Sequence, residues 1–179
     1  KAFHEVRVEK SFNKISLPVD IRNLNPLIKK DHVFAFGLMI VLSAETNDHF
    51  IDGVKQLQKK VDQKLAKLDP YALMMMMEAC HPSLNNFSNL LKYGKTSNDC
   101  MFSNLGKLDF IYEYDNFELV TIYSPSVIGP LGNTTTILTS TFRNEMDFSF
   151  VASEGYLPFK DAQLIKEKVI ALLEECVKI

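Results

Sequence analysis

The residues of this chain that could do chemistry rarely have the spacing of a catalytic motif. His49 is followed by Asp52 and Gly53, which is close to His-His-x-x-x-Asp-Gly, an acyl-transfer motif whose second histidine acts as a general base. Here, however, the step from histidine to aspartate is three residues instead of four, and Asp48 stands in place of the first histidine. Since Phe50 already belongs to an apolar helical pattern, we expect His49 to be a surface residue at a helix start.

Other chemical motifs are missing. The Gly-Pro-Leu-Gly segment over 129–132 has a proline where a phosphate loop needs a backbone donor, and no lysine follows it. The chain has no Gly-x-Ser-x-Gly and no His-Glu-x-x-His. Cys80, Cys100 and Cys176 stand apart, so they form no zinc-ligand pair, and we predict no metal residue. Three cysteines leave one unpaired in any disulfide scheme, which favours free thiols in a reducing, cytoplasmic compartment.

Four consecutive methionines, 74–77, occupy a stretch with helical character. Consecutive positions cover every face of a helix, so a metal or cofactor role is not indicated. We expect these flexible thioethers to fill an irregular core, and the alternative is that they line a lipid-accepting channel.

Composition is that of a folded domain. The 179 residues are 46% hydrophobic and 23% charged, with 20 basic and 22 acidic side chains. The net charge of −2 and the presence of only three arginines argue against a nucleic-acid partner. The longest apolar run, 33–42, is ten residues, whereas a membrane-spanning helix needs about 20. No linker divides the chain, so we predict a single domain over 1–179, and the opening at Lys1 suggests a piece of a longer protein.

Hydrophobic periodicity predicts the elements that must position these residues. A final helix is expected from Asp161 as its N-cap, and a hairpin is expected with Arg143, Asn144 and Glu145 between its strands. The other expected elements are strands at 15–22, 33–43, 100–102 and 119–123, hairpin strands at 136–142 and 146–150, and helices at 48–68, 70–79 and 84–93. This order predicts an α/β fold, a two-layer sandwich in which helices cover a mixed β-sheet.

Two segments carry more information together than any single motif. The first is Leu-Pro-Val-Asp-Ile-Arg-Asn over 17–23, and the second is Cys-Met-Phe-Ser-Asn-Leu-Gly-Lys-Leu over 100–108. The long helix lies between them, and strands, a hairpin and a terminal helix follow. From Leu17 to its end the chain resembles the C-terminal half of the chloramphenicol-acetyltransferase-like superfamily, which includes nonribosomal peptide condensation domains, polyketide-associated acyltransferases, alcohol acetyltransferases and plant acyltransferases.

The departures from this superfamily narrow the resemblance. Nothing in the chain corresponds to the first half of its members, which carries the His-His-x-x-x-Asp-Gly motif. The Asp-Phe-Gly-Trp-Gly segment of the plant branch is also missing, and the chain has no tryptophan. The resemblance is therefore to the polyketide-associated or alcohol acetyltransferase branch.

The resemblance implies acyl transfer from a thioester, on coenzyme A or an acyl carrier protein, to a hydroxyl or amine. It implies that the general base comes from an N-terminal lobe absent from this chain, so that no catalytic residue lies here and the chain alone is inactive. No covalently bound cofactor is implied. Ser103, Asn104 and Gly106 become candidates for the wall of the substrate channel, because Ser and Asn can donate to an oxyanion and Gly permits close approach. The alternative is a strand-end turn capped by its own side chains.

Asp20 and Arg22 are two residues apart on an expected strand, so their side chains should share a face. The resemblance implies a structural role for this pair, as a partly buried ion pair that supports the active site. The alternative is an ion pair that faces solvent.

Two further functions stay open. The chain could be a lobe of a nonribosomal peptide condensation domain, or a non-catalytic binding or scaffold domain with the same fold. A lobe without its mate should expose apolar surface, through which a homodimer could form.

Overall fold

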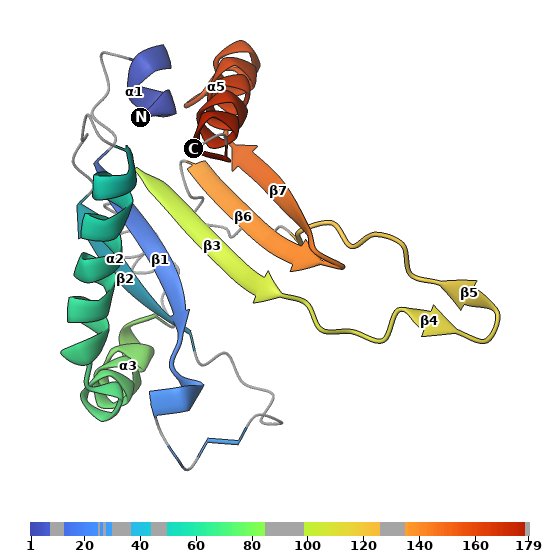
Figure 1. Cartoon of the computed structure of the whole chain (residues 1–179). Coiled ribbons are helices and arrows are strands. Elements are labelled where there is room, and N and C mark those ends of the chain that lie inside the picture. Colours follow the sequence, from blue (N-terminus) through green and yellow to red (C-terminus); the bar gives the residue numbers. More distant parts are fainter. Residues whose placement is uncertain are drawn as a thin grey trace. The chain divides into compact units, whose positions relative to one another are not determined.

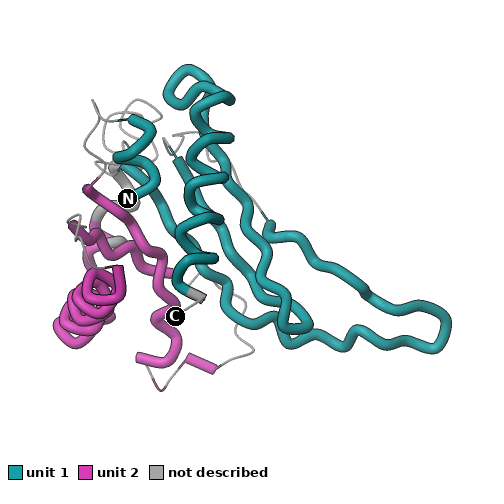
Figure 2. Tube along the Cα trace, turned by 45° about the horizontal axis from the view of Figure 1, so that its top comes forward, with its two compact units in different colours: residues 1–12, 99–128, 133–179 teal, residues 13–98, 129–132 magenta. Residues whose placement is uncertain are grey.

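The computed structural model describes residues 1–7, 13–24, 26, 28–29, 37–43, 50–84, 99–125 and 135–177. The chain divides into two compact units (Figure 2): unit 1 comprises 1–12, 99–128 and 133–179, and unit 2 comprises 13–98 and 129–132. His49, the 129–132 segment and all but the first residue of the helix expected at 84–93 lie outside the described residues. A single domain over 1–179 stays a prediction.

Unit 2 contains an antiparallel strand pair, β1 (Lys14–Asp20) and β2 (Gly37–Ser43), in which Leu17 pairs with Ile40. β2 falls within the segment expected at 33–43, and β1 begins one residue before the segment expected at 15–22. β1 ends at Asp20, and Ile21 is followed by a short 3-10 helix, η1 (Arg22–Leu24). Ile40 and Leu42 are buried and Met39 is 48% exposed, which is the alternation of a half-buried strand.

The helices of unit 2 are α2 (Phe50–Ala66) and α3 (Pro70–Leu84). Asp69 caps α3, because its Oδ1 accepts hydrogen bonds from the backbone N–H groups of Tyr71 (2.9 Å) and Ala72 (3.1 Å). Pro70 then occupies the first helical position, where its missing N–H is harmless. α3 continues past the predicted end at residue 79 to Leu84.

Three side chains of the methionine run do not pack in a core. Met74, Met75 and Met76 are exposed to 45%, 71% and 55%, so the core-packing prediction is wrong for these three side chains. The physical reason is geometric: three consecutive residues point in three directions around a helix, and one covered side cannot bury them all.

Unit 1 contains a mixed sheet of β3 (Cys100–Lys107), β6 (Thr135–Phe142) and β7 (Glu145–Ala152). β3 runs parallel to β6, and β6 runs antiparallel to β7 (Figure 1). The predicted hairpin is confirmed, with a turn of two residues instead of three. Arg143 and Asn144 both have positive φ, 49° and 67°, which is the conformation of a two-residue type I′ hairpin turn.

The register of this hairpin separates two apolar patterns. Phe142 pairs with Glu145 and Leu138 with Ser149, whereas Ile137 pairs with Phe150. Because paired residues of an antiparallel ladder share a face, Leu138 and Phe142 lie on one face of the sheet, and Ile137 and Phe150 lie on the other. Each face of the hairpin therefore carries an apolar set of its own.

Helices α5 (Phe159–Val177) and α1 (Ala2–Val6) cover the Phe150 face. Their shared core is formed by three buried residues: Ala2, Leu157 and Ile165. Two ion pairs join the helices, Arg7 to Asp161 at 3.0 Å and Lys168 to Glu5 at 2.9 Å. The predicted N-cap role of Asp161 is wrong, because α5 begins at Phe159 and Asp161 lies in its first turn, where it accepts from Arg7.

Residues 108–123 form an arm that extends from the sheet of unit 1 (Figure 1). It contains a small hairpin of β4 (Glu113–Tyr114) and β5 (Phe117–Glu118). The strand predicted over 119–123 is wrong: these residues are irregular, and the apolar pattern that suggested it belongs to the exposed arm. The structure confirms the α/β class with a mixed sheet covered by helices. None of the described helices is both long and apolar enough to cross a bilayer.

Candidate functional site

The predicted channel residues Ser103, Asn104 and Gly106 lie in β3, between its fourth and seventh residues. The side-chain Oδ1 of Asn104 accepts a hydrogen bond from the backbone N–H of Gly106 at 2.8 Å, and Gly106 has a φ of 70°. The ladder between β3 and β6 shifts its register between Asn104 and Lys107, so these residues form a bulge. This local arrangement matches the alternative to a channel wall, which was a strand-end turn capped by its own side chains.

Ser103 and Asn104 do not converge. Ser103 pairs with Leu138 and Asn104 pairs with Thr139, and consecutive strand residues point to opposite faces. Ser103 therefore lies on the Leu138 face, and Asn104 lies on the face that carries Phe150. The two side chains cannot form one wall on one face of this sheet, while the channel role of each residue separately stays a prediction.

Asp20 and Arg22 form an ion pair in unit 2. The Arg22 Nη2 to Asp20 Oδ2 distance is 2.6 Å, Arg22 Nε also donates to the carboxylate, and the backbone N–H of Arg22 donates to Oδ1 at 2.9 Å. The hydrogen bonds from Arg22 lower the pKa of Asp20 below its usual value.

The setting of this pair differs from the predicted one. Arg22 lies beyond the end of β1, so the two residues do not share a strand face. Their side chains are 48% and 40% exposed, which is the solvent-facing arrangement and not a partly buried pair. The supporting role of the pair for an active site stays a prediction.

A buried polar cluster on the Leu138 face has no counterpart among the sequence-based predictions. The backbone N–H of Ser124 donates to Asp147 Oδ2 at 2.6 Å, and Ser124 Oγ lies 2.8 Å from Ser140 Oγ. Ser149 Oγ donates to the carbonyl oxygen of Ser124 at 3.1 Å. Ser124 and Ser140 are 6% and 1% exposed, so these hydrogen bonds satisfy groups that would be costly to bury unpaired. The cluster fixes the returning end of the arm to β6 and β7.

Arg143, in the β6–β7 turn, holds the base of the arm. Its Nη1 bonds Glu118 Oε1, and its guanidinium lies 4.6 Å from the centre of the Tyr112 ring. Tyr112 in turn contacts Phe142 edge to face at 6.1 Å. The arm also exposes large apolar side chains, with Ile111 at 73% and Phe117 at 63%.

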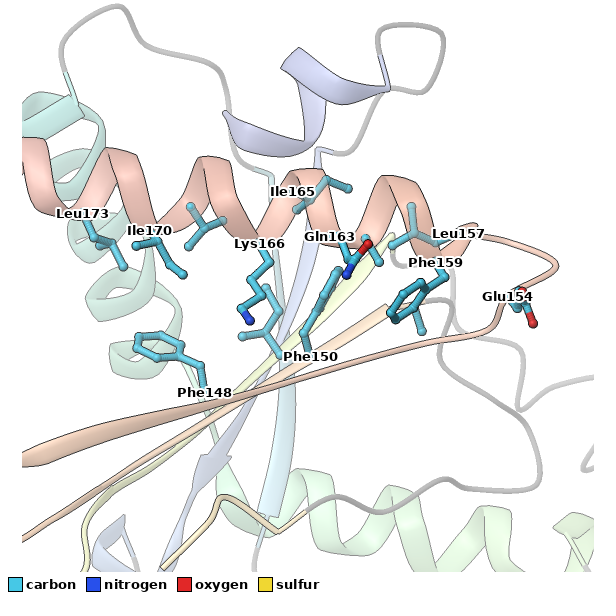
Figure 3. A pocket seen from close by; sticks show the side chains of 14 residues that line it. Phe148, Phe150, Glu154, Leu157, Phe159, Gln163, Ile165, Lys166, Ile170 and Leu173 are labelled. Carbon is cyan, nitrogen blue, oxygen red and sulfur yellow. The ribbon is translucent and has the colours of Figure 1, made fainter. Parts of the chain in front are cut away.

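An apolar groove of about 670 Å³ lies between α5 and β7 (Figure 3). Phe148 and Phe150 line it from the strand, and Ile170 and Leu173 line it from the helix. The channel candidates on β3 do not contribute to its lining. The groove and the strand end are therefore separate features of unit 1.

Nucleophilic and metal chemistry is sparse in the described residues. Burial raises the pKa of the Cys100 thiol to about 11, so this thiol is protonated at neutral pH and is a poor nucleophile. No three His, Cys, Asp or Glu side chains of the described segments are grouped as metal ligands would be.

Comparisons with known proteins show the fold. No protein family profile matches the chain, and no curated protein matches it. Among solved structures it is similar to the epimerization domain from the third module of tyrocidine synthetase B, a condensation-type domain, with a TM-score of 0.50 and 13% identity. The superposition covers 99% of this chain and 41% of that one. The chain thus has the fold of part of a condensation-type domain, and it spans less than half of that domain's length.

Proposed function

We propose that this chain is the C-terminal lobe of a two-lobed acyl-transferring enzyme. It would help to move an acyl group from a thioester of coenzyme A or a carrier protein to a hydroxyl or amine, with the general base on the other lobe. The observation that carries the proposal is the similarity of nearly the whole chain to 41% of a condensation-type domain. A thioester is already activated, so a base, an aligned acceptor and exclusion of water are sufficient for transfer.

The exposed apolar side chains of the arm are consistent with contact between this chain and a second lobe. Five of its large apolar side chains are at least 56% exposed: Phe110, Ile111, Phe117, Val120 and Tyr123. Such a concentration is unusual for a free surface and typical of a surface that contacts another protein segment. In the proposed enzyme the arm contacts the mate lobe, and the Arg143 contacts at its base hold it in place.

A second candidate function is that of a lobe of a peptide condensation domain, for which the donor would be a carrier-protein thioester. The similar structure is a domain of a peptide synthetase, which supports a lobe that acts on carrier-bound peptidyl or aminoacyl groups. A non-catalytic domain with the same fold is the third possibility.

The test compares this chain with the product of its complete reading frame. We expect the complete protein to transfer a radiolabelled acetyl group from acetyl-CoA, or from an acetylated carrier protein, to an alcohol or amine, and the 179-residue chain alone to be inactive. The better donor of the two separates the first candidate from the second. Transfer by this chain alone, or a complete reading frame without a His-His-x-x-x-Asp-Gly motif, would overturn the proposal.

The arm is tested through lobe association. Phe117→Ser should weaken binding between this chain and a separately expressed mate lobe, measured by calorimetry. Met75→Ser on α3 is the matched control, since Met75 is 71% exposed and lies outside the arm.

A further inference from the structure

The groove between α5 and β7 has the size and lining of a ligand site. Its volume of about 670 Å³ falls within the range of roughly 300–1,000 Å³ usual for small-molecule pockets. Its walls come from one helix and one hairpin of unit 1, so it needs no second unit for its shape. Most of the lining is aliphatic or aromatic.

The groove leaves apolar side chains in contact with water. Phe148 on β7 is 48% exposed, and Ile170 and Leu173 on α5 are 45% and 40% exposed. Ile170 and Leu173 are three residues apart and so lie on one side of the helix. Together with Phe148 they form a continuous apolar stretch at the C-terminal half of α5.

One cation lies within this apolar lining. Lys166 is the single basic residue among the described lining residues, and it forms no ion pair with any described residue. Figure 3 shows its ammonium end directed from α5 toward the strands, while Glu154 lies at the far end of the groove beyond Phe159. An unpaired ammonium group beside an apolar trough complements a ligand with one negative charge and a hydrocarbon chain.

We propose that this groove binds a single-chain fatty carboxylate. The carboxylate pairs with Lys166, and the chain lies along Phe148, Ile170 and Leu173, away from Glu154. A point-charge ammonium suits one carboxylate and needs no bidentate geometry. Since Ser103, Asn104 and Gly106 do not line the groove, this site lies outside the predicted acyl-transfer channel and does not depend on the proposed function.

The test uses the 179-residue chain and the fluorescent fatty acid cis-parinarate. We expect saturable binding that oleate displaces and that oleate methyl ester displaces more weakly. Lys166→Met removes the charge and keeps most of the stem, and it should weaken oleate binding roughly threefold to fivefold, the size expected for one partly exposed ion pair. Lys166→Arg should retain it, and Lys160→Met, on the same helix outside the groove, should change nothing.

The apolar trough is tested separately. Phe148→Ser should weaken binding of the acid and of its ester alike, by about tenfold, because buried aromatic area is lost for both. Met75→Ser, an exposed change on α3 outside the groove, is its control. Equal affinity for acid and ester, an unchanged Lys166→Met variant, or stronger binding of lysophosphatidate than of oleate would overturn the proposal. So would a dimer in sedimentation velocity that Phe148→Ser dissociates, because the occupant would then be a second copy of the chain.

Discussion

The carbonyl oxygen of the Asn104 side chain bonds the backbone N–H of Gly106 at 2.8 Å, two residues further along β3. The bond stabilises a bulge in which Gly106 has a φ of 70°. The Ser-Asn-x-Gly segment, which the sequence marked as a substrate-channel candidate, therefore has a local structural role that exists without any ligand. The backbone geometry of the bulge is enough to explain why asparagine and glycine occupy positions 104 and 106.

Gly106→Ala should lower the free energy of unfolding by about 1–2 kcal/mol, because a side chain at positive φ is sterically strained. No heavy atom lies within 4 Å of the position that the added methyl group would take, so strain and not crowding is the cause. Urea denaturation measures the change. Gly155→Ala, at a glycine that also has open space but no positive φ, should be nearly neutral. Equal effects at both sites would contradict this explanation.

Thr135→Val should stabilise the protein by about 1 kcal/mol, because it removes a buried hydroxyl without a partner and keeps the side-chain shape. Thr135 is fully buried, and its Oγ1 has no hydrogen-bond partner among the described residues. The midpoint of thermal unfolding should rise by a few degrees. Ser140→Ala is the contrasting variant: it removes the 2.8 Å partner of Ser124 Oγ and should destabilise. A loss of stability in Thr135→Val would show that its hydroxyl is bonded.

Cys100 should react with maleimide about a hundredfold more slowly at pH 8 than an ordinary thiol, because burial raises its pKa from 9.0 to about 11. The rate should increase as the pH rises toward 11, where the thiolate forms. Intact-mass spectrometry of a Cys80→Ser, Cys176→Ser variant measures this reaction at Cys100 alone. Unfolding in guanidinium should restore the ordinary rate. Fast labelling of the folded protein would show that the thiol is accessible and ionised.

Arg22→Gln should raise the pKa of Asp20 toward its ordinary value of 3.8, since the Arg22 hydrogen bonds are the largest cause of its depression. A carboxyl with a lowered pKa in the folded state stabilises it above the unfolded pKa, and this stabilisation is lost as the pH falls through the folded value. Because both side chains are 40% or more exposed, solvent screens the pair and the variant should lose little stability at pH 7.

NMR titration of the Asp20 carboxyl carbon measures this shift, and denaturation at pH 7 and at acidic pH measures the stability difference, which should vanish once Asp20 is protonated. Lys59→Gln, on the exposed side of α2, should leave the Asp20 titration unchanged. An unchanged titration in Arg22→Gln would assign the depression to another group.

Local periodicity was sufficient for most elements. The alternation around 136–150 predicted a hairpin, and the three- and four-residue steps after residue 50 predicted α2, because these patterns depend on which residues are neighbours in one helix or strand. Capping was less predictable: Asp161 has the residue type of an N-cap, yet its carboxylate pairs with Arg7, 154 positions away in the chain. Arg7 directly follows the short helix α1, which no pattern in the sequence predicted.

From the sequence alone we predicted most of the elements, the α/β class and the resemblance that pointed to a condensation-type fold. The face on which each side chain lies depends on tertiary pairing. The side chains of Ser103 and Asn104 lie on opposite faces of the sheet, three of the four methionines are exposed, and residues 119–123 belong to an arm instead of a strand. It also formed the groove that contains Lys166. The physical reason is that hydrophobic periodicity records that a segment has an apolar side, whereas the partner that covers this side, or leaves it open, is set by pairings between residues distant in sequence.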